Sequence, residues 1–497
     1  MELLGFSFFN LLSSEIWTLV VFLFVFLLVF DALRTRVPKN FPPGPFRLPF
    51  VGNLLQLNLK EPHIQFGKFA EKYGDIFSLR VGSSYMVVIN GFNAFKEAIV
   101  HQTDVFAGPP AFPIFEHVTK GHGIQFSYGE PWREQRKFAL TTLRSFGFGQ
   151  KSLEAKILEE CKCLHDEFMK EKGQPFNPQI RMNISVTNII CSIVFGDRYE
   201  YDDNALQEIH VLLDKFGEIL ESMWIQLYNA SPNVVKHLPG PHNHLFVIWK
   251  KLEDYIQEKI QQHRESWNPA EPRDFIDCYL SQIEKATPNS SFHDQNLLYS
   301  SLDLFFAGSE TTSTTLRWAL LYMAGYPDIQ EKVHDEIESV IGQQEPKMDD
   351  RNILPYTNAV IHEIQRKGNI APFTLTRETT RDTTVGKYFI PKGTQVIMNL
   401  YSVLMDKSEW ETPDEFNPEH FLDKTGKFVR KEAFVPFSGG KRNCMGEPLA
   451  RMELFLFITS LIQKFKFVVP EGVKISFDGV LMLTHAPRPY KICAIPR

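Results

Sequence analysis

A single cysteine follows a glycine-rich, basic loop near the C-terminal end of this 497-residue chain. Residues 437–446 have the sequence Phe-Ser-Gly-Gly-Lys-Arg-Asn-Cys-Met-Gly, with the cysteine at position 444. An apolar helical run over residues 448–457 follows, and this places the Cys444 sulfur at a helix N-terminus. Loop amides and the helix dipole favour a thiolate there, and the glycines let the backbone pass close to a flat, bulky group. The pattern favours a thiolate ligand for haem iron over the alternative, a buried structural cysteine after a glycine turn.

Residues 307–312, Ala-Gly-Ser-Glu-Thr-Thr, interrupt a long helical pattern that covers residues 296–324. Gly, Ser, Thr and Glu are poor choices in mid-helix for stability alone. Small residues such as Ala307 let a planar cofactor approach. The acid and hydroxyl groups of Glu310, Thr311 and Thr312 can hold water and pass protons. A helix kink or a small-residue packing contact is the alternative interpretation.

Two further pairs have helical spacing. Trp132 and Arg136 are four residues apart and therefore share a helix face, where a guanidinium group can bind a carboxylate with two hydrogen bonds. An exposed basic turn is the alternative. Glu363 and Arg366 are three residues apart and also face the same way. As a bare pair they are uninformative, because most such pairs are surface salt bridges.

These segments, in this order along the chain, resemble the signature motifs of the cytochrome P450 monooxygenases. The cysteine loop matches the family's F-x-x-G-x-R-x-C-x-G pattern at five positions: Phe437, Gly440, Arg442, Cys444 and Gly446. The resemblance implies haem b with the Cys444 thiolate as its axial ligand, and Ala307 beside it. It also implies that the haem propionates are bound by Trp132, Arg136, Arg377 and Arg442. Proton delivery during oxygen activation falls to Thr311 and Glu310, with Thr312 as a further candidate.

The resemblance extends to structural motifs. Glu363 and Arg366 match the family's E-x-x-R element, and residues 416–421 match the segment that supplies the third member of its buried network. Here that member is His420 where the family usually has Arg, so we expect a Glu363–Arg366–His420 network with a structural role. Pro109 stands where related enzymes often have Arg, which predicts the loss of one propionate contact.

An apolar run rich in Phe, Leu and Val covers residues 16–30, and residues 3–12 extend it. A bilayer core needs about 20 helical residues. The residues before the run are acidic or neutral, and no small-residue cleavage site follows. Both features favour an uncleaved signal anchor over a cleaved secretory signal. Basic residues follow the run, at Arg34, Arg36 and Lys39, and predict a cytosolic body with a lumenal N-terminus.

We therefore expect a transmembrane anchor over residues 1–36, a proline-rich hinge over 37–52 and one catalytic domain over 53–497. Helical patterns dominate residues 132–365, and short strands are predicted at 76–81, 85–89, 383–390 and 395–400. The fold class expected is mainly α with minor β-sheets. The resemblance specifies it as the cytochrome P450 fold behind an N-terminal transmembrane helix.

Composition agrees with a protein that handles apolar molecules. Hydrophobic residues make up 43% of the chain, and 43 residues are Phe. The net charge of −6 gives no indication of a nucleic-acid partner, and six scattered cysteines form no disulfide pattern. A reducing compartment is expected.

The resemblance is strongest to vertebrate microsomal members of the second P450 family, and residues 368–373 and 417–421 resemble the branch that epoxidises polyunsaturated fatty acids. It implies an endoplasmic-reticulum monooxygenase that hydroxylates or epoxidises polyunsaturated fatty acids or xenobiotics, using NADPH and dioxygen. The implied electron donors are NADPH-cytochrome P450 reductase and cytochrome b5. A local excess of basic residues on this acidic protein is the candidate docking face for them, and a solvated charged face is the alternative interpretation. Its residues are Arg133, Lys137, Lys424, Lys427, Arg430, Lys431 and Lys441. The implied substrate contacts are Ala111, Phe112, Phe115, Met223, Leu227, Phe305, Phe306, Ile370, Phe373, Leu481 and Met482.

Two other functions remain open at this point. One is a haem-thiolate isomerase or dehydratase that needs no reductase, which the intact Glu310-Thr311 pair argues against. The other is a non-catalytic haem protein that senses a gas or stores haem. Reductase-supported turnover with NADPH and dioxygen separates both from a monooxygenase.

Overall fold

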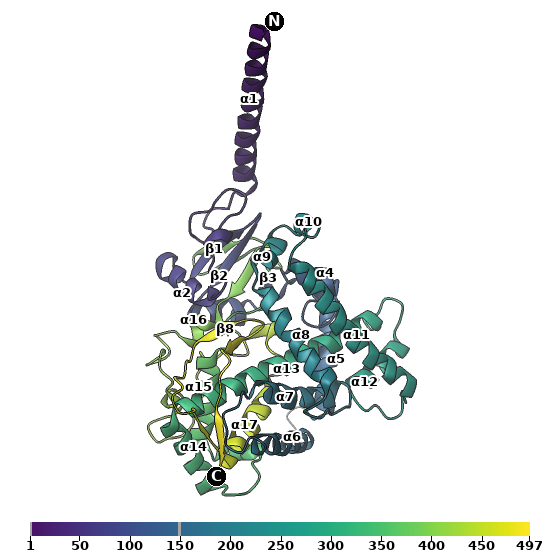
Figure 1. Ribbon diagram of the computed structural model, residues 1–497, viewed down its shortest axis with the longest axis vertical. Coiled ribbons are helices and arrows are strands. Elements are labelled where there is room, and N and C mark those ends of the chain that lie inside the picture. The colour runs from purple at the N-terminus through teal and green to yellow at the C-terminus, as the bar shows by residue number, and fades with distance from the viewer. Residues whose placement is uncertain (1, 148–150) are drawn as a thin grey trace.

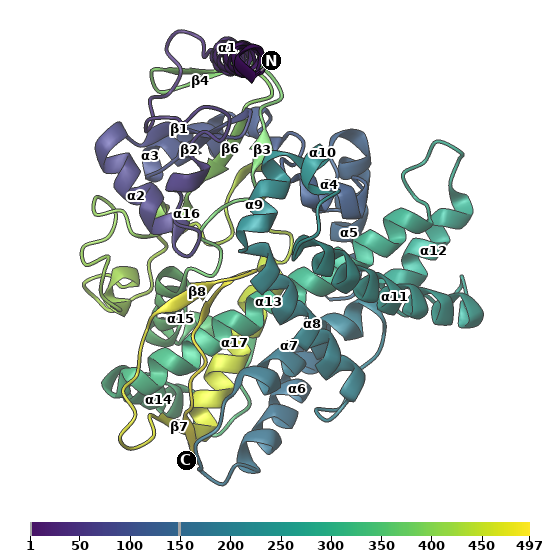
Figure 2. The same cartoon turned by 45° about the horizontal axis from the view of Figure 1, so that its top comes forward.

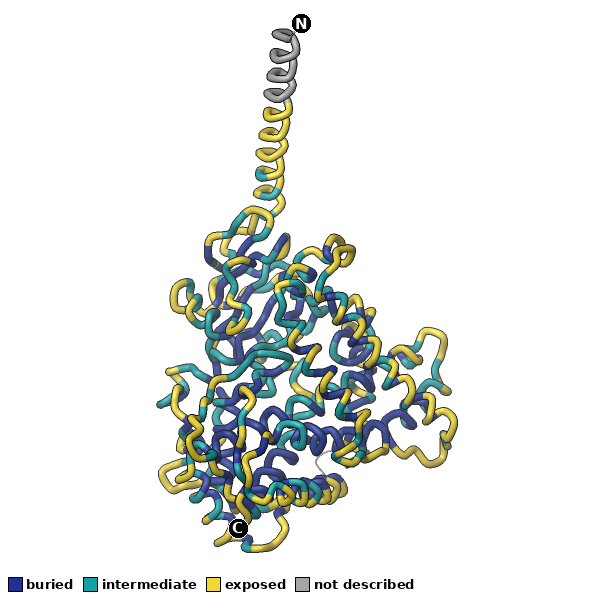
Figure 3. Tube along the Cα trace, viewed as in Figure 1, coloured by how far each residue is buried: buried dark blue, intermediate teal, exposed yellow. Residues whose placement is uncertain are grey.

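One long apolar helix stands apart from the body of the protein in the computed structural model, which describes residues 2–147 and 151–497 (Figure 1). This helix, α1 (Glu2–Arg34), contains an apolar stretch over Ile16–Arg34 that is long enough to cross a membrane, and none of that stretch is buried (Figure 3). A helix that is apolar on all sides requires a non-aqueous environment. The side chains of residues 3–12, which extend the apolar run, lie outside the described residues.

The end of α1 and the proline-rich segment after it are fixed to the first sheet. Arg80 donates two hydrogen bonds to the Asp31 carboxylate, at 2.9 and 2.5 Å. The Ser78 hydroxyl donates to the carbonyl of Pro42 at 2.7 Å, and the Tyr85 hydroxyl donates to the carbonyl of Thr35 at 2.7 Å. These bonds couple the direction of the helix to the body.

The sheets are small. Four strands pair in the order β1-β2-β6-β3, with β1 (Ile76–Val81) antiparallel to β2 (Ser84–Ile89) and β2 parallel to β6 (Gln395–Met398). The edge strand β3 (Arg377–Glu378) pairs antiparallel with β6, with Arg377 opposite Val396. Three two-stranded sheets complete the set: β4 (Thr383–Val385) with β5 (Tyr388–Ile390), β7 (Phe465–Val468) with β10 (Cys493–Pro496), and β8 (Gly479–Leu481) with β9 (His485–Pro487).

Helices make up most of the chain, which confirms the predicted fold class. After α1 they are α2 (Pro62–Tyr73), α3 (Phe92–Phe95), α4 (Pro113–Thr119), α5 (Gly129–Ser145), α6 (Lys151–Met169), α7 (Gln179–Val194), α8 (Asn204–Leu220), α9 (Met223–Ala230), α10 (Pro232–Val235), α11 (His242–Ser266), α12 (Phe275–Lys285), α13 (Asp294–Gly325), α14 (Pro327–Val340), α15 (Pro355–Gly368), α16 (Leu400–Leu404) and α17 (Glu447–Lys464).

Helix α13 crosses the centre of the molecule and packs on α7, α11, α15 and α17 (Figure 2). It begins two residues before the predicted start, where the His293 side chain accepts a hydrogen bond from the Asn296 amide, and it ends at Gly325, one residue after the predicted end. Helix α17 is buried along most of its length, since its Leu, Phe and Ile residues occur on all sides. These two helices form the walls of the site described next.

Candidate active site

A cavity of about 420 Å³ lies between α13, α17 and the cysteine loop, and its lining is mostly apolar. Cys444 is exposed even though it lies inside the molecule, because its free surface faces this cavity. Ala307, on α13, is exposed for the same reason. The residues that the sequence assigned to haem line the same space: Trp132, Arg136, Ala307, Arg377, Phe437, Arg442, Cys444 and Gly446. Gly440 does not line the cavity but shapes the loop.

Gly440 holds the cysteine loop against the π-helical turn Lys96–His101. Its φ is +69°, and a Cβ atom there would lie 2.5 Å from Thr103 Oγ1 and 2.7 Å from the carbonyl oxygen of Ile99. Both the backbone conformation and the close approach therefore require glycine. Across the loop, the Cys444 amide donates to the Phe437 carbonyl at 3.1 Å.

Two backbone amides, those of Gly446 and Glu447 at the start of α17, direct their hydrogens at the Cys444 sulfur. Burial raises the pKa of the thiol, while these amides and the Arg136 charge act against that rise. Hydrogen-bond donors and a positive charge are thus directed at the sulfur, which favours the thiolate. A metal ion supplies a further positive charge.

Three arginines face the cavity without a carboxylate partner in the described chain. Arg136 donates to the Asn443 carbonyl at 2.8 Å, Arg377 to the Gln125 carbonyl at 2.8 Å and Arg442 to the Ser127 carbonyl at 2.9 Å. Burial and the repulsion among these guanidinium charges lower the pKa of Arg377 and of Arg442.

The Arg442 guanidinium carbon also lies 3.7 Å from the centroid of the Trp132 ring, and its Nε has no partner in the described residues. Buried cations that are unneutralised in this way fit an anionic ligand, and the two propionates of haem are such a ligand. The residues present therefore fit haem b.

The α13 motif presents hydroxyl groups to the cavity. The Thr311 hydroxyl donates to the Ala307 carbonyl at 2.8 Å, so its oxygen remains free to accept a hydrogen bond from the cavity side. Thr312 and Thr315 line the same wall. Gly308 also serves helix packing, because a Cβ atom there would lie 2.8 Å from Ile190 on α7.

Glu310 does not join Thr311 at the cavity wall; it is not among the described residues that line the cavity. Its carboxylate accepts hydrogen bonds from Thr314 at 3.1 Å and from Thr484 at 3.0 Å, beside β9. Burial raises the pKa of this group. The side chain points away from the cavity because Thr484, distant in sequence, supplies a partner there.

The predicted structural network is present. Arg366 and Glu363 are fully buried and form two parallel hydrogen bonds of 2.7 and 2.8 Å. Arg366 also donates to the carbonyls of Leu404, Pro413 and Glu415. His420 Nδ1 lies 3.3 Å from Glu363 Oε2.

Only part of the predicted substrate set meets the cavity. Ile370 and Phe373 line it. Phe305 is buried in a separate helical core, and Phe306 packs edge-on against Phe216. Among the described residues, the following members of the set do not line the cavity: Ala111, Phe112, Phe115, Met223, Leu227, Phe305, Phe306, Leu481 and Met482. Phe305 and Phe306 lie on α13, and the other members lie on α4, α9 and β8 or next to them.

Two acids that the sequence analysis did not select also line the cavity, Asp303 and Glu453. Asp303 accepts hydrogen bonds from the backbone amides of Ile124 and Gln125 at 2.7 and 2.9 Å, and burial raises its pKa to about 7. Each is a single acidic residue within an apolar part of a helix. This pattern is visible in the sequence and could have identified both as candidate site residues.

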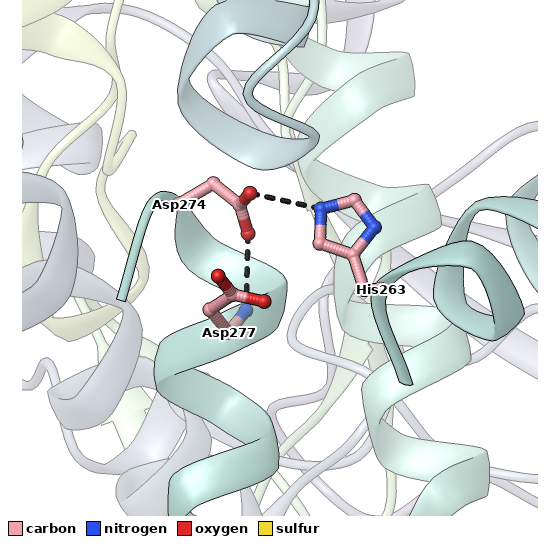
Figure 4. Close-up of side chains that lie close together, drawn as sticks. All are labelled: His263, Asp274 and Asp277. Carbon is pink, nitrogen blue, oxygen red and sulfur yellow. Dashed lines mark hydrogen bonds and ion pairs between the residues drawn. The ribbon is translucent and has the colours of Figure 1, made fainter. Parts of the chain in front are cut away.

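A separate buried cluster, His263, Asp274 and Asp277, joins α11 to α12 (Figure 4). His263 Nε2 lies 2.8 Å from Asp274 Oδ2, and Nδ1 lies 2.7 Å from the Lys259 carbonyl. Both partners are acceptors, so both ring nitrogens carry hydrogen and neither has a lone pair for a metal. The other Asp274 oxygen accepts from the Asp277 amide, so the cluster caps α12.

Comparison with known proteins agrees with the site. The family model described as Cytochrome P450 matches residues 42–494. This chain belongs to the cytochrome P450 family. It is 50% identical over 495 residues to cytochrome P450 2J2 of Homo sapiens, covering 98% of each chain. It is 51% identical to cytochrome P450 2J1 of Oryctolagus cuniculus (97% of this chain, 96% of the relative) and 46% identical to cytochrome P450 2C23 of Rattus norvegicus (100% of each).

As a P450, the protein is a haem-thiolate monooxygenase that uses dioxygen and NADPH-derived electrons delivered by a reductase, and it acts on lipophilic molecules. The apolar helix α1 is consistent with a membrane anchor on this P450.

Proposed function

We propose that this P450 hydroxylates or epoxidises long apolar molecules, with polyunsaturated fatty acids and lipophilic xenobiotics as its substrate classes. The apolar lining of the cavity carries the proposal, because an apolar wall favours molecules that lose apolar surface to water on binding. The nearby segment 368–373, which resembles the fatty-acid epoxygenase branch, contributes Ile370 and Phe373 to that wall.

In this proposal each of the cavity residues has a separate role. Cys444 ligates the haem iron, Arg136, Arg377 and Arg442 hold the propionates, and Trp132 supports Arg442. The haem supplies the iron at which dioxygen is activated. Thr311, whose hydroxyl hydrogen is committed to Ala307, holds water by accepting a hydrogen bond on the cavity side.

A Thr311→Ala variant tests that role, and Ser313→Ala is its matched control. Ser313 lies on the same helix, and its hydroxyl also donates to a backbone carbonyl, that of Glu310 at 3.1 Å, but it does not face the cavity. We expect Thr311→Ala to bind haem and substrate and to consume NADPH, while product falls and hydrogen peroxide rises. A positioned proton-transfer group contributes about 10²–10⁴ in rate. Unchanged product per NADPH in Thr311→Ala would refute the role, and Ser313→Ala should match wild type.

Substrate class is tested by spectral titration of the ferric protein. We expect a long-chain polyunsaturated fatty acid or an apolar xenobiotic to displace water and shift the Soret band at micromolar concentration. A short-chain carboxylate serves as the control, because it has the same charged group without the apolar chain. A response to the short acid alone would contradict the proposal.

We further propose that α1 anchors the protein in the endoplasmic-reticulum membrane with its body in the cytosol. The basic residues after the apolar run, Arg34 and Arg36 among them, support this orientation. Of the three N-x-S sequons, Asn183 is 2% exposed and Asn229 accepts a hydrogen bond from the Ile114 amide, whereas Asn289 is exposed. Asn289 is therefore the diagnostic site, and a glycan on it in cells would place the body in the lumen.

NADPH-cytochrome P450 reductase and cytochrome b5 are the proposed electron donors, docking on basic residues such as Lys137 and Lys427. Both are exposed. Their replacement by Ala should raise the reductase concentration needed for half-maximal turnover without changing haem content, and should do so most at low salt. An unchanged reductase dependence would contradict this docking face.

A further inference from the structure

Glu453 is a buried acid at the cavity that none of these roles uses. It lies on α17 with its side chain 1% exposed, and it lines the cavity together with Leu449 and Leu454. Positions 449 and 453 are one helical turn apart and share a face. The carboxyl group therefore faces the same space as Cys444.

Within the part of the chain that the structure describes, this carboxyl group has no counter-charge. Both of its oxygens are enclosed, and neither has a hydrogen bond of good geometry within the described residues. A buried carboxylate without partners is costly, so the neutral form is favoured. Burial raises the pKa of Glu453 to about 8, and the hydroxyl of Thr312, which faces it from α13, lowers that pKa in part.

The surroundings of Glu453 contain little else that titrates. From α6, the Cys161 thiol is close enough for the Glu453 charge to raise its pKa, and burial raises that pKa further, so the thiol is neutral. From α13, the facing polar group is the Thr312 hydroxyl. Within the described residues, no charged group of α14 or α15 forms an ion pair with Glu453.

We propose that the protonated Glu453 carboxyl group sets the direction of the Thr312 hydroxyl and makes Thr312 a hydrogen-bond donor into the cavity. A neutral carboxyl group can donate its hydrogen to the Thr312 oxygen, which frees the Thr312 hydrogen to point at cavity water. An ionised carboxylate only accepts, so the Thr312 hydrogen turns to it and the cavity loses a donor.

Adjacent threonines then have opposite roles. Thr311 gives its hydrogen to the Ala307 carbonyl and accepts on the cavity side, whereas Thr312 donates there. Water between them is oriented by one acceptor and one donor. Glu453 is thus a positioning residue that acts through Thr312, and this inference rests on the proton-delivery function proposed for α13.

Infrared difference spectroscopy of the haem-loaded, full-length protein tests the protonation state directly. We expect a protonated-carboxyl band at pH 7 that shifts in heavy water and disappears in Glu453→Gln. Asp303→Asn is the control, because it removes the other raised-pKa acid of the cavity and should leave this band in place. A wild-type spectrum at pH 7 that contains no band sensitive to Glu453→Gln would contradict the proposal.

The pH profile of product formed per NADPH tests whether ionisation of Glu453 removes the Thr312 donor from the cavity. In wild type we expect coupling to fall about tenfold as the pH rises through 8, because ionised Glu453 turns the Thr312 hydroxyl away. A glutamine amide both donates and accepts and cannot ionise. Glu453→Gln should therefore keep wild-type coupling at pH 7 and lose the alkaline fall, whereas Glu453→Leu and Thr312→Val should be poorly coupled at every pH.

An alkaline fall retained in Glu453→Gln, or wild-type coupling in Glu453→Leu, would overturn the inference. Glu453→Gln is nearly the same shape as the native residue and is expected to fold, as haem content and melting temperature will show. If Thr311→Ala leaves coupling unchanged, the role proposed for Thr311 fails, while the infrared band still reports on Glu453 independently.

Discussion

His420 Nδ1 lies 3.3 Å from Glu363 Oε2, and this contact joins the histidine to the buried network behind the cysteine loop. The other ring nitrogen, Nε2, accepts a hydrogen bond from the Thr412 backbone amide at 3.2 Å, so Nδ1 carries the ring hydrogen and donates it. His420 is therefore neutral. One carboxylate faces one guanidinium, and the histidine adds a donor without adding a second positive charge to a fully buried site.

Replacing His420 by Leu should lower the free energy of unfolding by about 1–3 kcal/mol, because the Thr412 amide and one Glu363 oxygen each lose a partner. His420→Asn keeps a short donor and should recover part of the loss. Denaturant unfolding of the haem-loaded protein measures both. A Leu variant as stable as wild type would show that the contact contributes nothing.

Gly440→Ala should destabilise the cysteine loop and lower haem occupancy. The added Cβ atom meets both Thr103 and Ile99 at a backbone φ of +69°, so strain and a steric clash combine, at a cost of about 1–3 kcal/mol. Gly426→Ala is the matched control, since Gly426 has a φ of +79° but open space around it. Equal haem-to-protein ratios in the two variants would contradict the steric requirement.

The contact between His263 of α11 and Asp274 at the start of α12 should make the free energy of unfolding depend on pH. Burial lowers the pKa of His263, but the hydrogen bond and charge of Asp274 outweigh it, so the folded-state pKa is raised above its ordinary value of 6.5. The stabilisation is then fully present below pH 6.5 and is lost as the pH rises through the folded-state pKa. Urea titrations at several pH values should show this fall in wild type, and His263→Gln should reduce it. An identical pH slope in the variant would argue against the assignment.

Two N-terminal truncations test separately whether α1 anchors the protein in a membrane and whether Asp31, near the end of α1, stabilises the folded body. Removal of residues 2–30 retains Asp31, whereas removal of residues 2–36 leaves the 4%-exposed Arg80 without its carboxylate partner. We expect both truncated proteins to bind haem and to retain only weak membrane binding through other apolar surface, as flotation with vesicles will show. The longer truncation should be less stable by about 1–3 kcal/mol. Full-strength membrane binding without α1 would contradict its role as the anchor.

Much of the site was predictable where the chemistry is local. The Cys444 loop, the hydroxyl groups of α13 and the Glu363–Arg366 pair are set by short sequence spacing, and the structure brings them to one cavity or behind it. The orientation of Glu310 was not predictable, because its partner Thr484 is far along the chain. The substrate contacts stay a prediction. Phe115, for example, packs against Phe216 of α8 and Trp249 of α11, and both partners are far along the chain.

Carbon monoxide binding to the reduced, haem-loaded protein tests the role of Cys444 most directly. A thiolate ligand donates electron density to the iron, so wild type should show the strongly red-shifted Soret band of thiolate-ligated haem. Cys444→Ser should lose that band together with monooxygenase activity, while Cys493→Ser, which replaces a half-buried cysteine on β10, should keep both. A Cys444→Ser protein that retains the red-shifted band would contradict the assignment of this sulfur as the haem ligand.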